Sequence, residues 1–265
     1  MTKHNLAIPL MFVLLFAACS APQGEITEPS AISSMEQTSD TPTPATSAPS
    51  ESPMAPTPEP SPAATLLYQG QASLRIVTGE GKVIYIDPYA GDSYDLPADL
   101  ILVTHGHYDH SAVDKVENRN PDCQIITHRE AVINGEHQIF DLGYVTVEAV
   151  EAGYNDWHDV NECAGYVVTF SDGHSIYVTG DTSTTEQMPQ LAEKEIDYAF
   201  FCCDGVFNMG LEEAARCAEM VNAKHNIPYH MTTNQEKVGF DREIAEQFGV
   251  ENRIILAPGE TLLIE

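Results

Sequence analysis

Basic residues are scarce in this sequence, in which 12 Lys and Arg stand against 40 Asp and Glu, and the formal net charge at pH 7 is −28. Proteins that bind nucleic acid draw much of their affinity from Lys and Arg placed on phosphates. A nucleic-acid partner is therefore not expected. The cysteines are also few, and no two of them have the Cys-x-x-Cys spacing of a structural zinc site. The sequence thus gives no sign of a cysteine-based metal site.

The N-terminal residues 1–19 have the layout of a secretory signal. A single cation, Lys3, precedes the apolar run 6–18, which is too short to span a bilayer comfortably, since spanning takes about 20 residues. The stretch Leu-Phe-Ala-Ala-Cys that ends at Cys19 resembles a bacterial lipobox, in which the Cys is diacylated and becomes the new N-terminus. We therefore expect an extracytoplasmic protein anchored to the bacterial cell membrane through lipidated Cys19. The alternatives are an ordinary cleaved signal and an uncleaved anchor.

Residues 20–64 have the composition of a linker. They hold 10 of the 17 prolines, many Ser, Thr and Ala, six acidic residues and no Lys or Arg. Such a segment cannot bury enough apolar surface to offset the entropy lost on ordering. We expect a semi-extended tether without secondary structure.

Five cysteines follow Cys19, namely Cys123, Cys163, Cys202, Cys203 and Cys217. An odd number permits one disulfide in an oxidising compartment, but the spacing does not indicate which residues pair. Cys202 and Cys203 lie in an apolar run typical of a strand, where cysteine usually serves as a small buried hydrophobe.

Residues 65–265 show the regular patterns of one folded domain. Short apolar or alternating runs predict strands over 74–77, 82–86, 99–103, 124–127, 144–150, 165–170, 175–179, 196–201, 226–230, 253–256 and 261–264. The run 99–103 is continuously apolar, which is typical of a strand buried on both faces. Helical patterns cover 112–118, 211–224 and 244–248. Strands in runs, followed by strands that alternate with helices, predict an α/β sandwich of about 200 residues.

Four potential metal ligands follow the run 99–103 directly: His105, His107, Asp109 and His110. Three imidazoles and a carboxylate placed together would be costly to bury without a cation, and they are the groups that Zn²⁺ favours in open catalytic sites. Gly106 lets the backbone turn tightly, so that neighbouring side chains can converge. The alternative, an exposed polar loop without function, is disfavoured.

The pattern His-x-His-x-Asp-His in residues 105–110 resembles the signature of the metallo-β-lactamase-fold hydrolases, and the sequence looks closest to their lactonase-like and uncharacterised metal-dependent branches. The resemblance covers roughly residues 66–265. Residues 177–182 resemble the family's Gly-Asp-Thr turn, 205–215 resemble the loop and helix that follow, and 227–230 resemble the strand that ends in the last metal-binding His. The implied fold is an αββα four-layer sandwich.

The same resemblance implies six metal ligands in this sequence, which are His105, His107, Asp109, His110, Asp181 and His230. Of these, His105 and His107 would hold a first cation. Asp109, His110 and His230 would hold a second, with Asp181 between the two.

One ligand that the resemblance implies is missing from the sequence. The family carries a third His for the first cation on a strand end near 152–156, where this chain reads Ala-Gly-Tyr-Asn-Asp. His158 lies just beyond and is one candidate, while Asn155, Tyr154 or water are the others. His128 also follows a predicted strand, and we expect it to be an ordinary loop residue.

The resemblance implies hydrolysis, in which two divalent ions on the order of 3.5–4 Å apart make a shared water nucleophilic at neutral pH. The substrate would be a small ester, lactone or phosphoester-type molecule, and true β-lactamase activity is not expected. Asp109 would be catalytic, orienting the hydroxide and carrying a proton to the leaving group. Aromatic residues Tyr154, Trp157 and Phe207 would wall the pocket.

The expected cofactor is Zn²⁺ at two sites, with Mn²⁺ as an alternative. Relatives that bind iron for redox chemistry usually carry Glu where His107 stands. A second reading is a non-catalytic surface lipoprotein that binds a metal or ligand through a degraded site. The sequence does not indicate the oligomeric state.

Overall fold

The computed structural model describes residues 62–234 and 237–265. The expected signal, Cys19 and all but the last residues of the expected linker lie outside this part of the chain. Within it, no helix is long and apolar enough to cross a membrane. Its five cysteines, Cys123 to Cys217, are all free thiols, so they form no disulfide with one another.

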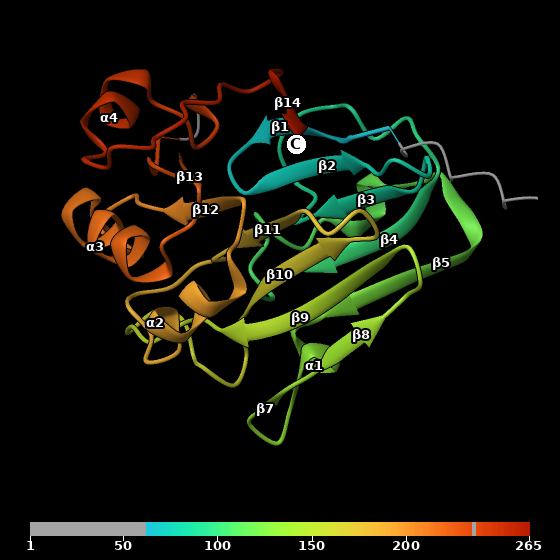
Figure 1. Cartoon of the computed structure of the whole chain (residues 1–265), viewed down its shortest axis with the longest axis horizontal. Helices are drawn as coiled ribbons and strands as arrows, with labels where there is room; N and C mark the ends of the chain where they lie inside the picture. Colours follow the sequence, from blue (N-terminus) through green and yellow to red (C-terminus); the bar gives the residue numbers. More distant parts are fainter. Residues whose placement is uncertain (1–61, 235–236) are drawn as a thin grey trace, which may run out of the picture. The chain divides into compact units, whose positions relative to one another are not determined.

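Two six-stranded sheets form the body of the domain (Figure 1). The first has the order β14-β1-β2-β3-β4-β5, with bounds Thr261–Ile264, Ala64–Gly70, Ser73–Val77, Val83–Ile86, Ala98–Val103 and Arg119–Thr127. The second has the order β13-β12-β11-β10-β9-β8, with bounds His225–Tyr229, Tyr198–Cys202, Ser175–Val178, Ala164–Phe170, Val145–Glu151 and Ile139–Asp141. A small hairpin joins β6 (Val132–Ile133) to β7 (Glu136–His137).

Each sheet combines antiparallel and parallel pairing. The neighbours β3, β4 and β5 are parallel in the first sheet, and β11, β12 and β13 are parallel in the second. All other pairs within the two sheets are antiparallel. The parallel strands matter for function because side chains that follow their carboxyl ends meet at one edge of a sheet.

The main hydrophobic core lies between the two sheets. Leu100 and Leu102 of β4 belong to the same core as Val147 of β9 and Tyr166 of β10. The alternate residues of β4 face the other side of the sheet, where they join a smaller cluster with Tyr85 and Tyr94. All six residues of β4 are buried, which confirms the predicted strand with two covered faces.

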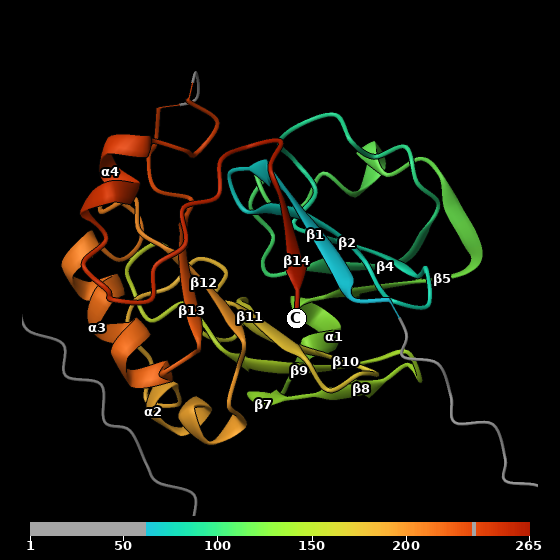
Figure 2. The same cartoon turned by 45° about the horizontal axis from the view of Figure 1, so that its top comes forward.

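Helices cover the outer side of the second sheet near β12 and β13, as Figures 1 and 2 show for α2 (Met188–Leu191), α3 (Leu211–Val221) and α4 (Arg242–Gln247). The predicted helix over 211–224 is confirmed except for its last turn, because Asn222 adopts the left-handed conformation and ends it. The buried residues of α3, Ala214, Cys217, Ala218 and Val221, lie on one face. The α/β sandwich with helices packed around its sheets is therefore confirmed.

Two predicted elements are wrong. The expected helix 112–118 is only the 3₁₀ turn η1 (Val113–Lys115), because the Arg119 guanidinium binds the carbonyls of Val113 and Val116 and the chain then enters β5. The outer face of the first sheet is thus covered here by loops and one turn. The expected strand 253–256 contributes a single bridge, between Arg253 and Asn226. Short additional elements, α1 (His128–Ala131) and η2 (Ala192–Lys194), had no clear sequence signal.

Candidate metal centre

The residues with metal-binding side chains follow strand ends in both sheets. His105, His107, Asp109 and His110 follow β4, while Asp181 follows β11 and His230 follows β13. The two sheets touch here, since the Ala164 amide donates to the Thr104 carbonyl at 2.9 Å. Gly180 permits this approach, because a Cβ at its position would lie 2.9 Å from Cβ of Thr104. Segments distant in sequence thus converge on one site.

Asp87 holds the histidine loop in place. Its buried carboxylate accepts hydrogen bonds from the Thr104 amide at 2.7 Å, from the Thr104 hydroxyl at 2.7 Å and from His110 Nδ1 at 2.8 Å. With Nδ1 engaged, Nε2 of His110 faces the centre, which is the arrangement of a carboxylate-oriented metal ligand. In the sequence, Asp87 simply follows the predicted strand 82–86 and shows no sign of this role. Its left-handed backbone, with φ +44°, is not encoded in any motif.

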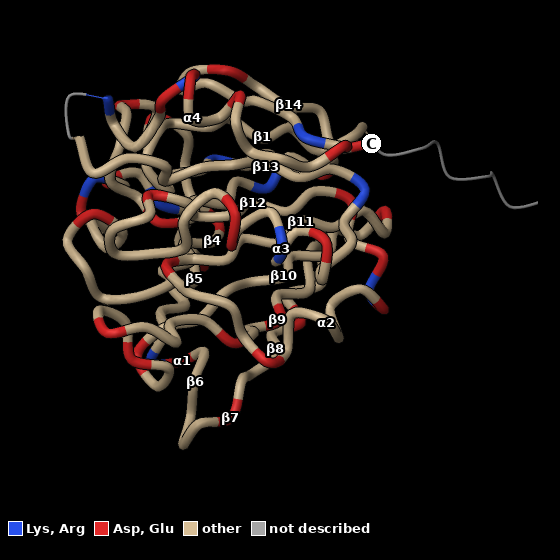
Figure 3. The backbone as a smooth tube through the Cα atoms, turned by 90° about the vertical axis from the view of Figure 1, so that its left-hand side faces the viewer, with Lys and Arg blue, Asp and Glu red and all other residues tan. Residues whose placement is uncertain are grey.

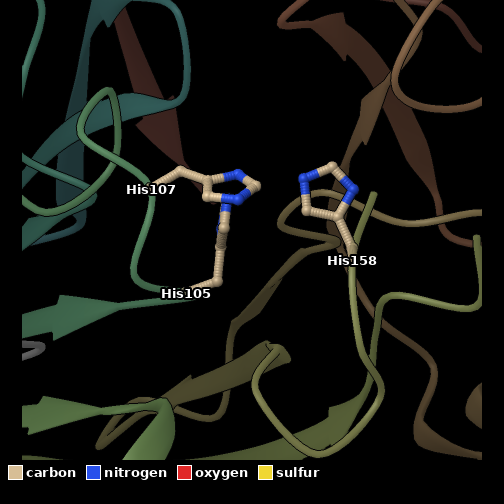
Figure 4. A group of neighbouring side chains, drawn as sticks. All are labelled: His105, His107 and His158. Carbon is tan, nitrogen blue, oxygen red and sulfur yellow. The ribbon is translucent and has the colours of Figure 1, made fainter. Parts of the chain in front are cut away.

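His158 completes a first group of possible ligands with His105 and His107. One nitrogen from each of the three rings lies within 4.8 Å of the others, and Figure 4 shows the rings of His107 and His158 turned toward one another. Asn155 fixes His158, because its Oδ1 lies 3.0 Å from His158 Nδ1 and also accepts the His158 amide. Of the candidates left open for the missing imidazole, the structure places His158 there and gives Asn155 a supporting position.

Asp181 lies between this group and a second one. Its Oδ2 is 3.4 Å from Nε2 of His158 and 3.4 Å from Nε2 of His230, and its Oδ1 is 3.4 Å from Nε2 of His110. Two ligand atoms bound at about 2.1 Å to one tetrahedral ion lie about 3.4 Å apart. The second group consists of Asp109, His110 and His230, and His105 forms a further trio with His110 and Asp181.

The fit of a cation is tested by buried polar atoms that lack partners. His105 Nε2, His110 Nε2 and Asp181 Oδ1 are shielded from solvent and have no hydrogen-bond partner in the described part of the chain. Leaving such an atom unpaired costs about 1–3 kcal/mol. Imidazole nitrogen and carboxylate oxygen are the donors that Zn²⁺ takes. The donor set therefore fits divalent cations.

The electrostatics of the cluster keep ligand atoms available. Burial, followed by the neighbouring His110, holds the pKa of His105 well below its usual value, so this ring stays neutral. Burial also lowers the pKa of His158. Burial raises the pKa of Asp181, but the nearby imidazoles of His230 and His110 lower it more and leave that pKa well below the usual range. Asp181 is therefore ionised.

His110 behaves differently from the other rings. Burial lowers its pKa, yet the carboxylates of Asp181 and Asp87 outweigh burial and raise the pKa well above 6.5. A cation that binds His110 must therefore displace a proton, which makes binding dependent on pH.

Several contacts of the site had no sequence signal. The Asn208 amide donates to Asp181 Oδ2 at 2.9 Å and to Asp204 Oδ2 at 2.7 Å. Asp204 Oδ2 in turn lies 3.6 Å from Nδ1 of His230. Asp204 and Asn208 lie on the loop after β12, and only the folded geometry brings them to the centre.

A cavity of about 310 Å³ opens over the centre. Its lining consists of His107, Tyr108, Asp109, Trp157, His158, Asp181, Phe207 and His230. Trp157 and Phe207 meet edge to face, with ring centroids 5.1 Å apart. The expected aromatic wall thus contains Trp157 and Phe207, whereas Tyr154 does not line this cavity.

A second hollow of about 480 Å³ also borders the first histidine group and is likewise lined by Trp157. His128 and Arg129 line it together with His105, His107 and His158. His128 therefore approaches the site more closely than an ordinary loop residue, although it belongs to none of the ligand groups found in the described residues.

Comparison with known proteins points to metal-dependent hydrolases. Residues 65–230 match the family model described as the beta-lactamase superfamily domain. A UPF0173 metal-dependent hydrolase of Thermococcus onnurineus is 30% identical over 221 residues, which cover 74% of this chain and 97% of the relative. Its counterpart in Koribacter versatilis is 27% identical over 224 residues, covering 74% and 96%.

Solved structures agree with the fold. A protein of Parabacteroides distasonis assigned as a metal-dependent hydrolase aligns with a TM-score of 0.60 at 28% identity, over 73% of this chain and 92% of its own. Igni18, a metallo hydrolase of Ignicoccus hospitalis, aligns with a TM-score of 0.59 at 19% identity, over 77% and 99%. The second likeness concerns the fold alone.

Proposed function

Because this chain belongs to the metallo-β-lactamase superfamily, and within it to the UPF0173 family of metal-dependent hydrolases, we propose that it hydrolyses a small ester or lactone at a centre of two divalent cations. The position of Asp181 carries this proposal. Its carboxylate lies at 3.4 Å from imidazole nitrogens of both ligand groups, so it can serve two cations at once.

His105, His107 and His158 would hold the proposed first cation, with Asp181 shared. Asp109, His110 and His230 would hold the second, again with Asp181. Zn²⁺ is the favoured ion for this imidazole-rich set, with Mn²⁺ as an alternative. His107 stands where the resemblance places Glu in iron-dependent relatives, which argues against redox chemistry.

A pair of divalent cations, when bound, makes water nucleophilic at neutral pH and polarises the electrophilic oxygen of a substrate. Asp109 faces the 310 Å³ cavity and is partly exposed, so its carboxylate can orient the attacking water and pass a proton to the leaving group. His110 is fully buried and Asp181 is nearly so, which fixes the positions of both side chains.

The walls of the cavity favour an uncharged substrate. Trp157, Phe207 and Tyr108 supply aromatic surface, and no Lys or Arg of the described residues lines this cavity. The negative charge of a phosphoester would meet the two cations but no cationic side chain of this lining. A carboxylic ester or lactone fits better, in line with the lactonase-like branch that the sequence resembles.

The case for a non-catalytic binding protein rested on the missing third imidazole. His158 lies where that ligand was expected, so the site does not look degraded. The lipobox at Cys19 supports a further part of the proposal, in which the domain is tethered to the bacterial cell membrane and acts outside the cytoplasm.

Metal analysis and an esterase and lactonase screen of the purified full chain test this function. We expect about two Zn²⁺ or Mn²⁺ per chain and turnover of at least one uncharged ester or lactone. His107→Ala and Asp181→Ala should abolish turnover while the domain remains folded. The exposed control Asp122→Asn should behave as wild type. Full activity in either site variant would refute the proposal.

A further inference from the structure

Gln71, in the turn between β1 and β2, is held rigidly against the end of β13. Its backbone amide donates to the Val238 carbonyl at 2.6 Å. Its backbone carbonyl accepts from the Tyr68 hydroxyl at 3.0 Å and from the His230 backbone amide at 3.2 Å. Its backbone is left-handed, with φ +50°, a conformation that is unfavourable for a residue other than glycine. Such a residue persists where its surroundings fix it, and these positions cluster at functional sites.

This backbone aims the Gln71 side chain into the proposed second cation site. The amide nitrogen Nε2 lies 2.9 Å from Asp109 Oδ2 and 2.8 Å from His230 Nε2. Those two atoms are themselves 3.9 Å apart. The amide therefore touches two of the three residues that form the second group.

The His230 Nε2 lone pair can accept a hydrogen bond from Gln71 or bind a cation, but it cannot do both. When a cation takes that lone pair, the Gln71 N–H group would point at a positive charge. A turn of 180° about the last side-chain bond exchanges the amide nitrogen and oxygen, which have the same shape. Oε1 now lies beside Gly239, which has no side chain to occupy that space, since a Cβ at Gly239 would be only 2.4 Å from Oε1.

We propose that Gln71 is a ligand of the second cation and binds it through the side-chain amide oxygen. This inference rests on the two-cation centre proposed above. After the turn, the oxygen would take the place of Nε2, at 2.8 and 2.9 Å from the ligand atoms of His230 and Asp109. Neighbouring ligands of a six-coordinate ion with bonds of about 2.1 Å lie about 3.0 Å apart, so the spacing fits.

The two cation sites then differ in chemistry. The first has three imidazoles and Asp181, a set that suits Zn²⁺. The second gains a third oxygen donor from Gln71, beside Asp109 and Asp181. Carboxylate and amide carbonyl oxygens suit Mn²⁺ better than imidazole alone does. The second site is therefore the one that accepts Mn²⁺.

Metal titration of the full chain tests the assignment without any substrate. Metal-free wild type, Gln71→Leu and the control Gln190→Leu, an exposed residue of α2, are titrated with Mn²⁺ followed by electron paramagnetic resonance, and with Zn²⁺ against a chromophoric chelator. Gln71→Leu should keep one Zn²⁺ site of wild-type affinity. Its Mn²⁺ affinity should fall at least about 10-fold, because loss of even an outer partner of a metal ligand costs 10–100-fold. Gln190→Leu should match wild type.

Gln71→Glu provides a second variant of nearly the same shape. A carboxylate in place of the amide should tighten Mn²⁺ binding. If Gln71→Leu binds both cations as wild type does, or if it does not fold and Gln71→Glu leaves the Mn²⁺ affinity unchanged, Gln71 is not a ligand. If wild type itself retains no cation, the proposed function and this inference both fail. If wild type binds cations and only the result for the Gln71 variants is contrary, this inference alone fails.

Discussion

Asp87 shows at the scale of one residue how the centre is organised from outside its ligands. Its carboxylate accepts three hydrogen bonds from Thr104 and His110, which sets both the loop and the ring orientation. An amide of the same shape has only one oxygen to accept with, and its NH₂ group would face donors. Replacing Asp87 with Asn therefore removes hydrogen bonds without changing the volume of the side chain.

Asp87→Asn should lower the free energy of unfolding of the metal-free chain by about 1–3 kcal/mol, because it leaves at least one buried donor unpaired. It should also weaken cation binding about 10- to 100-fold, because His110 loses its orienting partner. Denaturant unfolding and metal titration measure the two effects, with Asp122→Asn as the exposed control. A loss of stability with unchanged metal affinity would mean that Asp87 supports only the fold.

The ligands named from the sequence lie in segments that resemble the family's motifs. His105 to His110 are contiguous and follow β4, while Asp181 and His230 follow strands of their own. His158, Gln71 and Asp87 could not be assigned, because their roles depend on turns and long-range contacts. Left-handed backbone at Gln71, Asp87 and Tyr154, with φ +50°, +44° and +61°, sets those turns, and no composition rule predicts it.

At the scale of elements, the site depends on how closely the end of β11 approaches the end of β4. Gly180, between β11 and Asp181, has φ +61°, and a Cβ there would meet Cβ of Thr104 at 2.9 Å. Gly173, in the turn between β10 and β11, has φ +93° but no atom within 4 Å of such a Cβ. Comparing alanine substitutions at the two glycines therefore separates the cost of backbone strain from the cost of steric contact.

Gly180→Ala should destabilise the domain by roughly 1–3 kcal/mol more than Gly173→Ala does, because it adds a clash between the sheets to a similar backbone strain. It should also weaken cation binding, since Asp181 follows directly. Denaturant unfolding of the two variants measures the difference. Equal losses of stability in the two variants would show that the structure accommodates a Cβ between Gly180 and Thr104 without an energetic cost.

The buried carboxylate of Asp197 links the start of β11 to the residue before β13. Asp197 accepts from the Ser175 amide at 2.8 Å and from the Lys224 ammonium at 2.6 Å. Burial raises the pKa of Asp197, but hydrogen bonds from Lys224 and Ser175 outweigh burial and leave the pKa below its ordinary value of 3.8. Asp99 makes the corresponding contacts in the first sheet, with the Val83 amide and Lys82.

Since the folded-state pKa of Asp197 is depressed, its contribution to stability is complete above pH 3.8 and is lost as pH falls through the folded-state value. Asp197→Asn should therefore have a lower free energy of unfolding than wild type near neutral pH. The difference between the two free energies should narrow in acid. Urea unfolding at a series of pH values measures this. A gap that stays constant down to the lowest pH at which the chain folds would contradict the assignment.

Strands were predicted better than helices because their signals are local. Alternating and continuous apolar runs gave most strands of both sheets, including β4, β10 and β14. The wrong helix at 112–118 had an apolar pattern, but Arg119 turns the carbonyls of that segment to its own side chain. Likewise, Ile254, Ile255 and Leu256 pack on the core, and the segment forms only one bridge to β13, through Arg253. Tertiary contacts decided both cases.

At the scale of the whole molecule, acidic residues dominate. Figure 3 shows Asp and Glu along much of the described chain and Lys and Arg at few places. The charge of −28 belongs to the full sequence, of which the six acidic residues of 20–64 are a part. Two bound divalent cations would add four positive charges where His and Asp converge, and would reverse the local potential that a substrate meets.

The central claim is that both sheets together hold a pair of cations around Asp181. Anomalous diffraction from crystals of the zinc-loaded full chain tests it most directly. We expect two peaks flanking the Asp181 carboxylate, one bound by His105, His107 and His158 and the other by Asp109, His110 and His230. No peak at Asp181, or a single peak with His158 turned away from it, would contradict the account.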